Sequence, residues 1–550
     1  MPTLTIDGQQ VTVPEKTNVI EAAKTLGIEI PHYCYHPGLS VAGNCRMCMV
    51  EIEKAPKLAI GCFTPCTEGM VVFTNTEKVK QARKDVLEFL LSNHPLDCPV
   101  CDQAGECWLQ IYYMQHGQYE SRMMENKIKK SKKATSIGPH VNLDQERCVL
   151  CGRCVRFCDE ITKTHELGIF GRGNREELDV FPGKQLDNRY SGNVVDICPV
   201  GALTDRDFRF QVRVWYLGVQ DSVCPGCSRG CNIQIHYNRN RPHHGHGRRV
   251  ARLKPRYNSH VNQFWMCDEG RYGYKFVDAG DRIISPMLRR GAELQMATWG
   301  ETLAASAERI RAVNPSQIGV IAWPQLTNEE LYLVRRLFVD GLGCKNVSFS
   351  VPSKKDGGGD DFLITADKNP NTRGAGEIGL PIADSTGDIL QAASRGEFKL
   401  LHIFGHDLLS SGLDQPLVES ALAATETVIF QGSNSHLTVD RADIVLPSAT
   451  FAEKSGSFTN FEGRVQRIHE AVPPLGDALP DWQILNRMAR ALEMGWDYQG
   501  TEHIFKELAE NVAAFSGLSY CVLGDQGELL GYKPTNEAHI PTEPVTTVII

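Results

Sequence analysis

The hydrophobic positions at the N-terminus switch from a two-residue period to a helical period, which marks a small folded domain. Residues 3–13 alternate apolar and polar positions in "TLTIDG" and "QQVTV", a pattern typical of two short strands. The segment "TNVIEAAKTLG" then follows a helical period, with Thr17 as the expected N-cap and Gly27 as the expected end. An α+β domain is therefore predicted to open the chain.

Two further helical patterns flank a stretch rich in cysteine. In "VKQARKDVLEFLLS" (residues 79–92) apolar side chains fall on one face of a helix. This stripe comprises Val79, Ala82, Val86, Phe89 and Leu90. A second helix is predicted from Trp108 in "WLQIYYMQHG", whose aromatic side chains we expect to pack rather than to react. Between the two helices lies "HPLDCPVCDQAGEC", residues 94–107.

From about residue 280 the chain alternates short apolar runs with amphipathic helices. "IGVIAW" precedes the helix "TNEELYLVRRLFVDGLG", "KLLHIFG" precedes "DQPLVESALAA", and "TVIFQG" precedes "ADIVLP". This alternation predicts a parallel sheet with covering helices. Upstream of it, "NIQIHY" and "RVARLKP" predict a hairpin around the polar loop "NRNRPHHGHGR".

The composition argues against several classes of protein. A chain of 550 residues exceeds one hydrophobic core, so several domains are expected. A net charge of −8 with both signs mixed argues against a nucleic-acid binder, and the basic run "KIKKSKK" is expected to be a solvated linker. No stretch approaches the ~20 apolar residues that span a bilayer, and "MPTLTIDGQQ" lacks a signal-peptide layout. Any membrane contact is therefore expected to be made through partners.

The cysteines point to metal ligation. Of the 19 cysteines, only Cys344 and Cys521 lie beyond residue 270. Such a dense set is hard to explain as disulfides in a reducing compartment. The spacing divides most of the others into candidate sites of four ligands each.

The first candidate site consists of Cys34, Cys45, Cys48 and Cys62. Small residues near Cys45 and Cys48 allow backbone N–H groups to approach cluster sulfides, and Cys62 follows the apolar strand "MVEIEKAPKLAIGC". The first spacing is wider than in plant ferredoxins, so the pattern predicts a variant [2Fe-2S] site. A structural zinc site is the alternative, although such sites usually pair two short Cys-x-x-Cys motifs.

A ferredoxin-like triad follows further along the chain. "RCVLCGRCVRFC" contains Cys148, Cys151 and Cys154, and "DICPVGAL" supplies the remote Cys198 before a proline. Bacterial ferredoxins bind a [4Fe-4S] cluster with this arrangement, and we predict the same cluster here. Cys158 stands where such a ferredoxin sends a ligand to a second cubane, but no second triad lies nearby, so we interpret it as a non-ligand.

Another cysteine triad flanks the predicted hairpin. "CPGCSRGC" contains Cys224, Cys227 and Cys231, and "WMCDEGRYGY" adds Cys267 after the hairpin. This arrangement resembles the [4Fe-4S] site of molybdopterin oxidoreductases such as formate dehydrogenases. Zinc is the alternative, since Cys-x-x-Cys alone is common, but the hairpin context favours the cluster.

The remaining candidate set, His94, Cys98, Cys101 and Cys107, could by itself bind zinc or an iron–sulfur cluster. Beside three predicted iron–sulfur sites, a [4Fe-4S] cluster with one histidine and three cysteine ligands is favoured. An incidental histidine at a helix end is the alternative for His94. No nucleophile context surrounds the cysteines that are left over, which are Cys66, Cys158, Cys344 and Cys521.

In their order along the chain, the four sites resemble those of the large iron–sulfur subunit of NADH-quinone oxidoreductase, the 75 kDa subunit family of complex I. The stretches "SPMLRR", "TWGETLAASAERI" and "ADIVLPSATFAEKSGSFTNFEGRVQR" extend the resemblance over nearly the whole chain. It implies a multidomain α+β and α/β fold, with an N-terminal [2Fe-2S] ferredoxin-like β-grasp domain, cubane-cluster domains and a C-terminal molybdopterin-oxidoreductase-like α/β domain. The implied cofactors are one [2Fe-2S] cluster and three [4Fe-4S] clusters.

The same resemblance implies a division of the chain into six segments. They are the [2Fe-2S] ferredoxin-type domain (1–78), the [4Fe-4S] domain with one histidine and three cysteine ligands (79–118), the ferredoxin-like [4Fe-4S] domain (119–216), the Mo/W bis-MGD-type [4Fe-4S] domain (217–273), the molybdopterin-oxidoreductase-like domain (274–530) and a C-terminal tail (531–550).

The C-terminal domain is expected to be vestigial and to bind no molybdenum. In the active molybdenum enzymes a cysteine, selenocysteine or serine binds the metal after a segment like "GLGCKNV", whereas the stretch that follows here contains no cysteine. No surrounding motif supports Ser348, Ser350 or Ser353 in that role. The resemblance also implies that Phe451 to Gln466 form a structural turn.

Two motifs match binding patterns that we do not expect this chain to use. "GAGEIG" (residues 374–379) fits a dinucleotide-binding pattern but follows a polar loop rather than a strand. "HHGH" (His243, His244 and His246) is expected to be a solvated hairpin tip rather than a metal site.

The function implied by the resemblance is electron transfer. The chain would relay electrons from a flavin on a partner subunit toward quinone, within a respiratory, ion-translocating complex. Its partners would be the flavin/NADH-oxidising subunit and other peripheral-arm subunits of complex I, on the cytoplasmic side of the cell membrane. The cluster at Cys224 to Cys267 is expected to hold the junction to the C-terminal domain rather than to carry current. The alternative is a subunit of a soluble NAD-linked formate dehydrogenase or hydrogenase.

Overall fold

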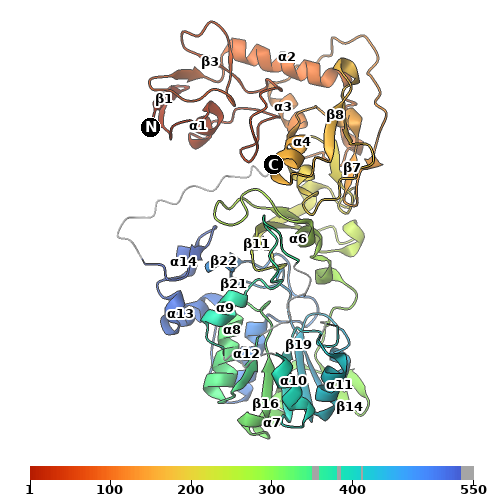
Figure 1. Ribbon diagram of the computed structural model, residues 1–550, viewed down its shortest axis with the longest axis vertical. Coiled ribbons are helices and arrows are strands. Elements are labelled where there is room, and N and C mark those ends of the chain that lie inside the picture. The colour runs from red at the N-terminus through yellow and green to blue at the C-terminus, as the bar shows by residue number, and fades with distance from the viewer. Residues whose placement is uncertain (350–357, 381–385, 411–412, 534–550) are drawn as a thin grey trace. The chain divides into compact units, whose positions relative to one another are not determined.

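The computed structural model describes residues 1–349, 358–380, 386–410 and 413–533, and it separates into two compact units (Figure 1). The first unit contains residues 1–217 together with the short segment 244–246. The second contains residues 218–243 and the described residues from 247 on. Three of the four predicted ligand sets therefore lie in the first unit, and the fourth lies in the second.

The first unit begins with a five-stranded sheet of order β2-β1-β5-β3-β4. Its strands are β1 (Thr3–Ile6), β2 (Gln9–Thr12), β3 (Met49–Ile52), β4 (Ala59–Ile60) and β5 (Val71–Phe73). Strand β1 pairs antiparallel with β2 and parallel with β5, as expected of a β-grasp domain. Helix α1 (Val19–Thr25) packs on this sheet and buries Ile20 and Ala23 in one cluster with Leu4 and Ile6.

Two local predictions in this domain are wrong. The N-cap of α1 is Asn18 and not Thr17, because the Asn18 amide oxygen accepts a hydrogen bond from the Glu21 backbone N–H. The stretch before the fourth cysteine is a β3–β4 hairpin and not a single strand. Its polar turn contains Pro56 and Lys54, whose φ of 65° breaks the extended conformation.

Helix α2 (Glu77–Asn93) leads the chain to the second ligand set. Its buried residues are Val79, Arg83 and Leu87, spaced by four positions along the helix. The predicted apolar stripe is therefore only partly right, since Phe89 is 78% exposed. Apolar periodicity could not show that an arginine would occupy the buried face.

Short elements follow α2 along the chain of the first unit. They are α3 (Trp108–His116), β6 (Thr135–Ser136), β7 (Val141–Leu143), α4 (Arg153–Arg156), β8 (Leu167–Phe170), β9 (Glu177–Val180), α5 (Asn193–Asp196) and β10 (Leu203–Asp205). Strands β10, β7 and β6 form one sheet, and β8 pairs with β9. Helix α3 forms where it was predicted and buries Tyr112, which packs against Trp108 with 5.4 Å between ring centroids.

The second unit opens with the predicted hairpin. Strand β11 (Leu217–Val223) joins β12 (Asn232–Asn238) and β13 (Val250–Pro255) in a three-stranded sheet, in which β12 and β13 pair antiparallel. Helix α6 (Asp268–Tyr272) follows. The fourth ligand set lies at the end of β11, in the turn before β12 and at the start of α6.

A seven-stranded sheet of order β15-β14-β20-β19-β18-β16-β17 forms the core of the second unit. Its strands are β14 (Met287–Arg290), β15 (Glu293–Met296), β16 (Ile318–Ile321), β17 (Asn346–Ser348), β18 (Leu400–Phe404), β19 (Thr427–Gly432) and β20 (Ile444–Pro447). The strands from β16 to β20 are parallel, as predicted. The hairpin of β14 and β15 adds an antiparallel edge that the sequence pattern did not indicate.

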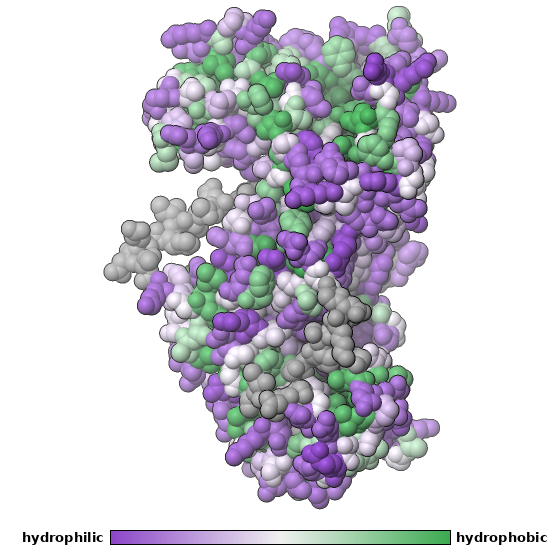
Figure 2. Space-filling view, in the orientation of Figure 1, coloured by the Kyte–Doolittle hydropathy of each residue, from purple (hydrophilic) through white to green (hydrophobic). Residues whose placement is uncertain are grey.

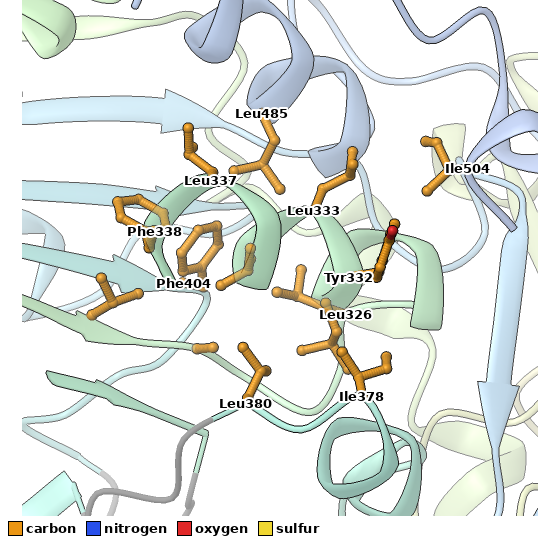
Figure 3. Packing of buried hydrophobic residues seen from close by; sticks show 14 of the residues in the cluster. Leu326, Tyr332, Leu333, Leu337, Phe338, Ile378, Leu380, Phe404, Leu485 and Ile504 are labelled. Atoms are coloured by element: carbon orange, nitrogen blue, oxygen red, sulfur yellow. The ribbon is translucent and has the colours of Figure 1, made fainter. Parts of the chain in front are cut away.

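Alternate residues of the parallel strands face two separate hydrophobic clusters. In β18, Leu400 and Phe404 belong to one cluster, and Leu401 and Ile403 belong to the other. The first cluster is shown in Figure 3, where Phe338 and Phe404 lie close together, with ring centroids 6.5 Å apart. The sheet is therefore buried on both faces, as expected for parallel strands.

Different helices cover the two faces of this sheet. Those on the first cluster are α7 (Trp299–Arg311), α8 (Asn328–Val334), α12 (Asp481–Ala491) and α13 (Thr501–Asn511). Those on the second cluster are α10 (Thr386–Ser394) and α11 (Gln415–Ala424). The long helix predicted after "IGVIAW" is split, because α8 continues as a π-helical segment over Arg335–Gly341.

The segment Phe451 to Gln466 contains a tight hairpin. Strand β21 (Gly456–Thr459) pairs with β22 (Arg464–Ile468), which also pairs with β23 (Glu528–Leu529). Nearby elements of the second unit are α9 (Thr372–Glu377) and α14 (Tyr520–Leu523). The "GAGEIG" motif lies in and after α9, and no strand is formed over residues 358–371 before it. It is therefore not a strand-to-helix phosphate loop.

Polar side chains cover much of the face shown in Figure 2, with apolar patches among them. Large apolar side chains that are exposed include Phe63 and Phe89. Within the described part of the chain, none of the helices combines the length and the apolar character needed to cross a bilayer.

Lys454 joins distant segments of the second unit through buried ion pairs. Its Nζ lies 2.6 Å from Glu330 Oε2 in α8 and 2.9 Å from Asp481 Oδ2 in α12. The three side chains are 4%, 0% and 3% exposed. Burial raises the pKa of Glu330, and Lys454 opposes that rise because its charge stabilises the carboxylate. The two carboxylates therefore depend on one ammonium group.

We expect Lys454→Met to lower the free energy of unfolding by about 3–5 kcal/mol at neutral pH, because it leaves buried carboxylates without a cation. Because burial raises the pKa of Glu330 to about 7 in the fold, protonation favours the folded state, and the loss should shrink as the pH falls from about 7 toward the ordinary carboxyl pKa, below which it levels off. Equilibrium urea unfolding measures both effects. The exposed Lys345→Met is the matched control, and equal values for the two variants would contradict the prediction.

Candidate iron–sulfur sites

The first ligand set converges around the loop between α1 and β3. The Cys34 thiol lies within hydrogen-bond range of the thiols of Cys45 and Cys62, and Cys48 lies within range of Cys62. The backbone N–H groups of Tyr33 and Cys34 both donate to Cys45 Sγ at 3.4 Å. The predicted approach of backbone donors to sulfur is therefore present, and the four thiols share one site.

The second ligand set lies between α2 and α3. His94 is the C-cap residue of α2, Cys98 begins a short 3-10 turn, and Cys107 is the N-cap residue of α3. Cys101 interacts electrostatically with Cys98 and with Cys107. Burial lowers the pKa of His94 to about 4, so its imidazole is neutral near pH 7, which is the form that binds metals.

The third ligand set lines a single cavity. Cys148, Cys151, Cys154 and Cys198 all contribute to its wall, together with apolar side chains. Burial raises the pKa of Cys198 to about 11, and it raises the pKa of the other three thiols as well. Free thiols here would stay protonated near pH 7, and ligation of a cationic iron core would offset the cost of ionising them.

The fourth ligand set also lines one cavity, to which Cys224, Cys227, Cys231 and Cys267 all contribute. The backbone N–H of Gly226 donates to Cys224 Sγ at 3.5 Å, and that of Gly270 donates to Cys267 Sγ at 3.3 Å. A Cβ on Gly270 would lie 2.8 Å from Cys224 Sγ. Glycine is therefore needed where the backbone approaches these thiols.

Cysteines of three ligand sets share one hydrophobic cluster of the first unit. They are Cys34, Cys45, Cys107, Cys148, Cys151 and Cys198. The rings of Tyr33 and Tyr112 lie within the cluster, with centroids 5.4 Å apart. A Cβ on Gly201 would lie 2.5 Å from Cys101 Sγ, which places the chain of the third set against a thiol of the second. The three sets are therefore neighbours in one apolar environment.

Sequence reasoning missed the arginines that surround these sites. The Arg147 Nη2 lies 2.7 Å from Asp97 Oδ2, and the guanidinium interacts electrostatically with Cys101. Arg153 and Arg156 lie beside ligands of the first and third sets. All three arginines occur within "ERCVLCGRCVR", but their spacing alone does not tell a buried arginine from a solvated one.

Cys158 lies outside the cavity lined by the third set. Burial and the nearby Glu166 carboxylate raise its pKa to about 12, so it is a neutral thiol near pH 7. The other cysteines without a predicted site are two buried ones, Cys66 and Cys344, and the exposed Cys521. The interpretation of Cys158 as a non-ligand stays a prediction.

The structure also places Ser348 and the "HHGH" histidines, which the sequence analysis considered as metal ligands. Ser348 ends β17 and is buried, with its Oγ 3.5 Å from Thr386 Oγ1, whereas Ser350 and Ser353 lie outside the described residues. The histidines of "HHGH" lie at a short turn, His244–Gly247, in the β12–β13 connection. Among the residues that the structure describes, no group of three or more His, Cys, Asp or Glu side chains is arranged to hold a single metal ion.

We expect Gly201→Ala to remove the cluster of the second set or to weaken its binding, because the new methyl group would overlap Cys101 Sγ. Iron and acid-labile sulfide, measured after anaerobic reconstitution, should fall by about one cubane. Gly280→Ala is the control, since a Cβ there meets no atom within 4 Å. Full cluster content in Gly201→Ala would refute the close contact.

We expect His94→Ala to lose the low-temperature EPR signal of the second set, because a neutral, buried imidazole is removed from the predicted ligand position. His94→Cys should keep a cubane with a lowered reduction potential, since a thiolate adds negative charge. His165→Ala is the control, because His165 is an exposed histidine of the same unit. A wild-type signal in His94→Ala would remove His94 from the ligand set.

Five family models match the chain in the predicted order. Their descriptions are a 2Fe-2S iron-sulfur cluster binding domain (residues 1–77), an NADH-ubiquinone oxidoreductase-G iron-sulfur binding region (83–122), the ferredoxin-like domain of NADH-quinone oxidoreductase subunit 3 (138–204), a molybdopterin oxidoreductase Fe4S4 domain (218–279) and molybdopterin oxidoreductase (354–491). Each ligand set falls within one of the first four matches. The predicted fold class is confirmed, and the chain carries iron–sulfur binding domains.

Relatives match over nearly the full length of the chain. The NADH-quinone oxidoreductase G subunit of Rickettsia bellii is 31% identical, over 94% of this chain and 90% of that protein. The mitochondrial NADH-ubiquinone oxidoreductase 78 kDa subunit of Candida albicans is 30% identical, over 92% of this chain and 85% of that protein. A solved NAD+-reducing [NiFe]-hydrogenase is 31% identical over 39% of this chain and 91% of that one, with a TM-score of 0.34. The chain belongs to the family of the large iron–sulfur subunit of NADH-quinone oxidoreductase, its G subunit.

Proposed function

We propose that the chain holds one [2Fe-2S] cluster on its first ligand set and three [4Fe-4S] clusters on the others, as the iron–sulfur electron-transfer subunit of an NADH-quinone oxidoreductase. The sets are Cys34, Cys45, Cys48 and Cys62; His94, Cys98, Cys101 and Cys107; Cys148, Cys151, Cys154 and Cys198; and Cys224, Cys227, Cys231 and Cys267. The observation that carries the proposal is the shared hydrophobic cluster, which brings cysteines of three sets together.

Iron–sulfur clusters at these sites would supply one-electron oxidation and reduction. The residues of the chain have three tasks. Thiols and one imidazole bind iron, backbone N–H groups such as those of Tyr33 and Gly270 donate to ligand sulfurs, and buried apolar side chains exclude water. Such contacts and burial set cluster potentials, so the role of the protein is positioning and tuning. No catalytic residue is assigned.

The domain boundaries, partners and location belong to the same proposal. We infer domains at 1–78, 79–118, 119–216, 217–273 and 274–530, and the matched ranges of the family models support this division. The partners would be a flavin/NADH-oxidising subunit and other peripheral-arm subunits, on the cytoplasmic side of the cell membrane. The C-terminal domain would be vestigial and free of molybdenum. The relatives are named as quinone oxidoreductase subunits, which does not favour a role in a soluble dehydrogenase or hydrogenase.

Anaerobic co-purification of the chain with its neighbours, followed by low-temperature EPR under NADH, tests this function. We expect membrane subunits in the preparation, reduction of the clusters by NADH, and their reoxidation by quinone. Stoichiometric zinc without acid-labile sulfide would overturn the cluster assignment. A preparation containing only soluble subunits, or molybdenum-dependent formate oxidation, would overturn the respiratory assignment.

A pair of cysteine variants tests the assignment of the third set. Cys198→Ser should lose one [4Fe-4S] EPR signal, because Cys198 lines the cavity with the other three thiols. Cys158→Ser should keep all signals, because Cys158 is buried but lies outside that cavity. Iron and sulfide content measures the same difference, and the reverse outcome would exchange the roles of the two cysteines.

A further inference from the structure

Arg153 is a buried arginine that ties two ligand sets together. It is 7% exposed. Its Nη1 donates to the Ile197 carbonyl oxygen at 3.2 Å, and its Nη2 donates to the Tyr35 carbonyl oxygen. Ile197 directly precedes Cys198, and Tyr35 directly follows Cys34. One guanidinium therefore links backbone segments that carry ligands of the third and the first set.

The charge of Arg153 faces thiols rather than carboxylates. The groups that interact with it electrostatically include the thiols of Cys151, Cys45 and Cys198, the hydroxyl of Tyr112 and the imidazoles of His32 and His36. Within the described ranges, Arg153 forms no ion pair with a carboxylate, and its Nε has no hydrogen-bond partner. A guanidinium stays protonated at physiological pH, and burying it without an anion costs several kcal/mol. Ligand thiolates on both sides would provide the missing negative charge.

We propose that Arg153 is a positioning residue shared by the first and third sites, and that its single charge raises the reduction potentials of both clusters. The proposal rests on the assignment of clusters to these two ligand sets. A cluster becomes more negative when it takes up an electron, and a fixed nearby cation stabilises the reduced form more than the oxidised form. Because the surroundings are buried, water and salt screen this interaction only weakly.

A second arginine of the same unit provides the contrast. Arg83 is 4% exposed, and its Nε and Nη2 have no hydrogen-bond partner. Its electrostatic partners are Asp7, Cys48 and Tyr112, so it faces a ligand of the first set and is partly neutralised by a carboxylate. Burial alone is therefore common to Arg83 and Arg153, whereas contact with two ligand sets distinguishes Arg153.

Redox titration of the reconstituted full-length chain, followed by EPR, tests the proposal. The [2Fe-2S] signal reports on the first site, and the signal absent from Cys198→Ser reports on the third. In Arg153→Gln and Arg153→Met, the reduced-to-oxidised ratio of both clusters at the wild-type midpoint should fall at least tenfold, a shift of about 59 mV for a one-electron couple. Arg153→Lys keeps the charge and should stay within a threefold change. Arg83→Gln should move only the [2Fe-2S] signal.

Several outcomes separate tuning from a merely structural role. Unchanged potentials in Arg153→Gln and Arg153→Met, a shift of only one signal, or an equal shift in Arg153→Lys would each overturn the proposal. If both neutral variants lose the two clusters while Arg153→Lys holds both, the shared requirement for the charge is supported. Loss of only one cluster, or loss in Arg153→Lys as well, would overturn it. Wild-type protein without EPR signals or sulfide would instead overturn the proposed function.

Discussion

The fold of the first unit depends on one physical constraint, which is that many thiols are gathered in an apolar interior, where any thiolate charge would need compensation. Burial raises the pKa of thiols such as Cys107 and Cys198, so their ionised forms need nearby positive charge. The fold meets this need with backbone N–H groups at the first set and with buried arginines between the sets. Short helices and turns dominate here because they deliver many backbone donors over few residues.

The second unit consists of more regular elements, arranged around one large sheet. Hydrophobic clusters cover both faces of its sheet, whereas buried charged side chains gather near the first turns of α8 and α12. Lys454, Glu330 and Asp481 form such a group and are almost completely withdrawn from water. The fourth ligand set lies in the β11–β12 turn and at the start of α6, apart from this sheet.

Much of the fold followed from hydrophobic periodicity, since the strand signals in "IGVIAW", "KLLHIFG" and "TVIFQG" fell on β16, β18 and β19. The helical alternation failed after "TVIFQG", because "ADIVLP" forms the strand β20 and not a helix. The predictions were wrong where two residues suited the same position about equally well. Asn18 and Thr17 are both competent caps, and only the chain geometry selects Asn18. Phe89 fitted an apolar stripe, but Arg83 lies on the buried face, where the Asp7 carboxylate partly neutralises its charge. Spacing indicated the candidate ligands, whereas the buried arginines beside them give no periodic signal.

The pairing of β1 with β5, Thr5 opposite Val71, has a consequence for synthesis. The first sheet closes within the first 73 residues, and Cys62, the last ligand of its set, already lies inside that span. The ligand sets follow one another along the chain without interleaving, so each is complete before the next begins. Domains fold in N-to-C order as the chain is made. The strands β14 and β20, by contrast, pair Met287 with Val445, so the large sheet cannot close until most of the polypeptide has emerged. All four predicted ligand sets are thus synthesised before β20, the strand that completes the pairing of the C-terminal sheet.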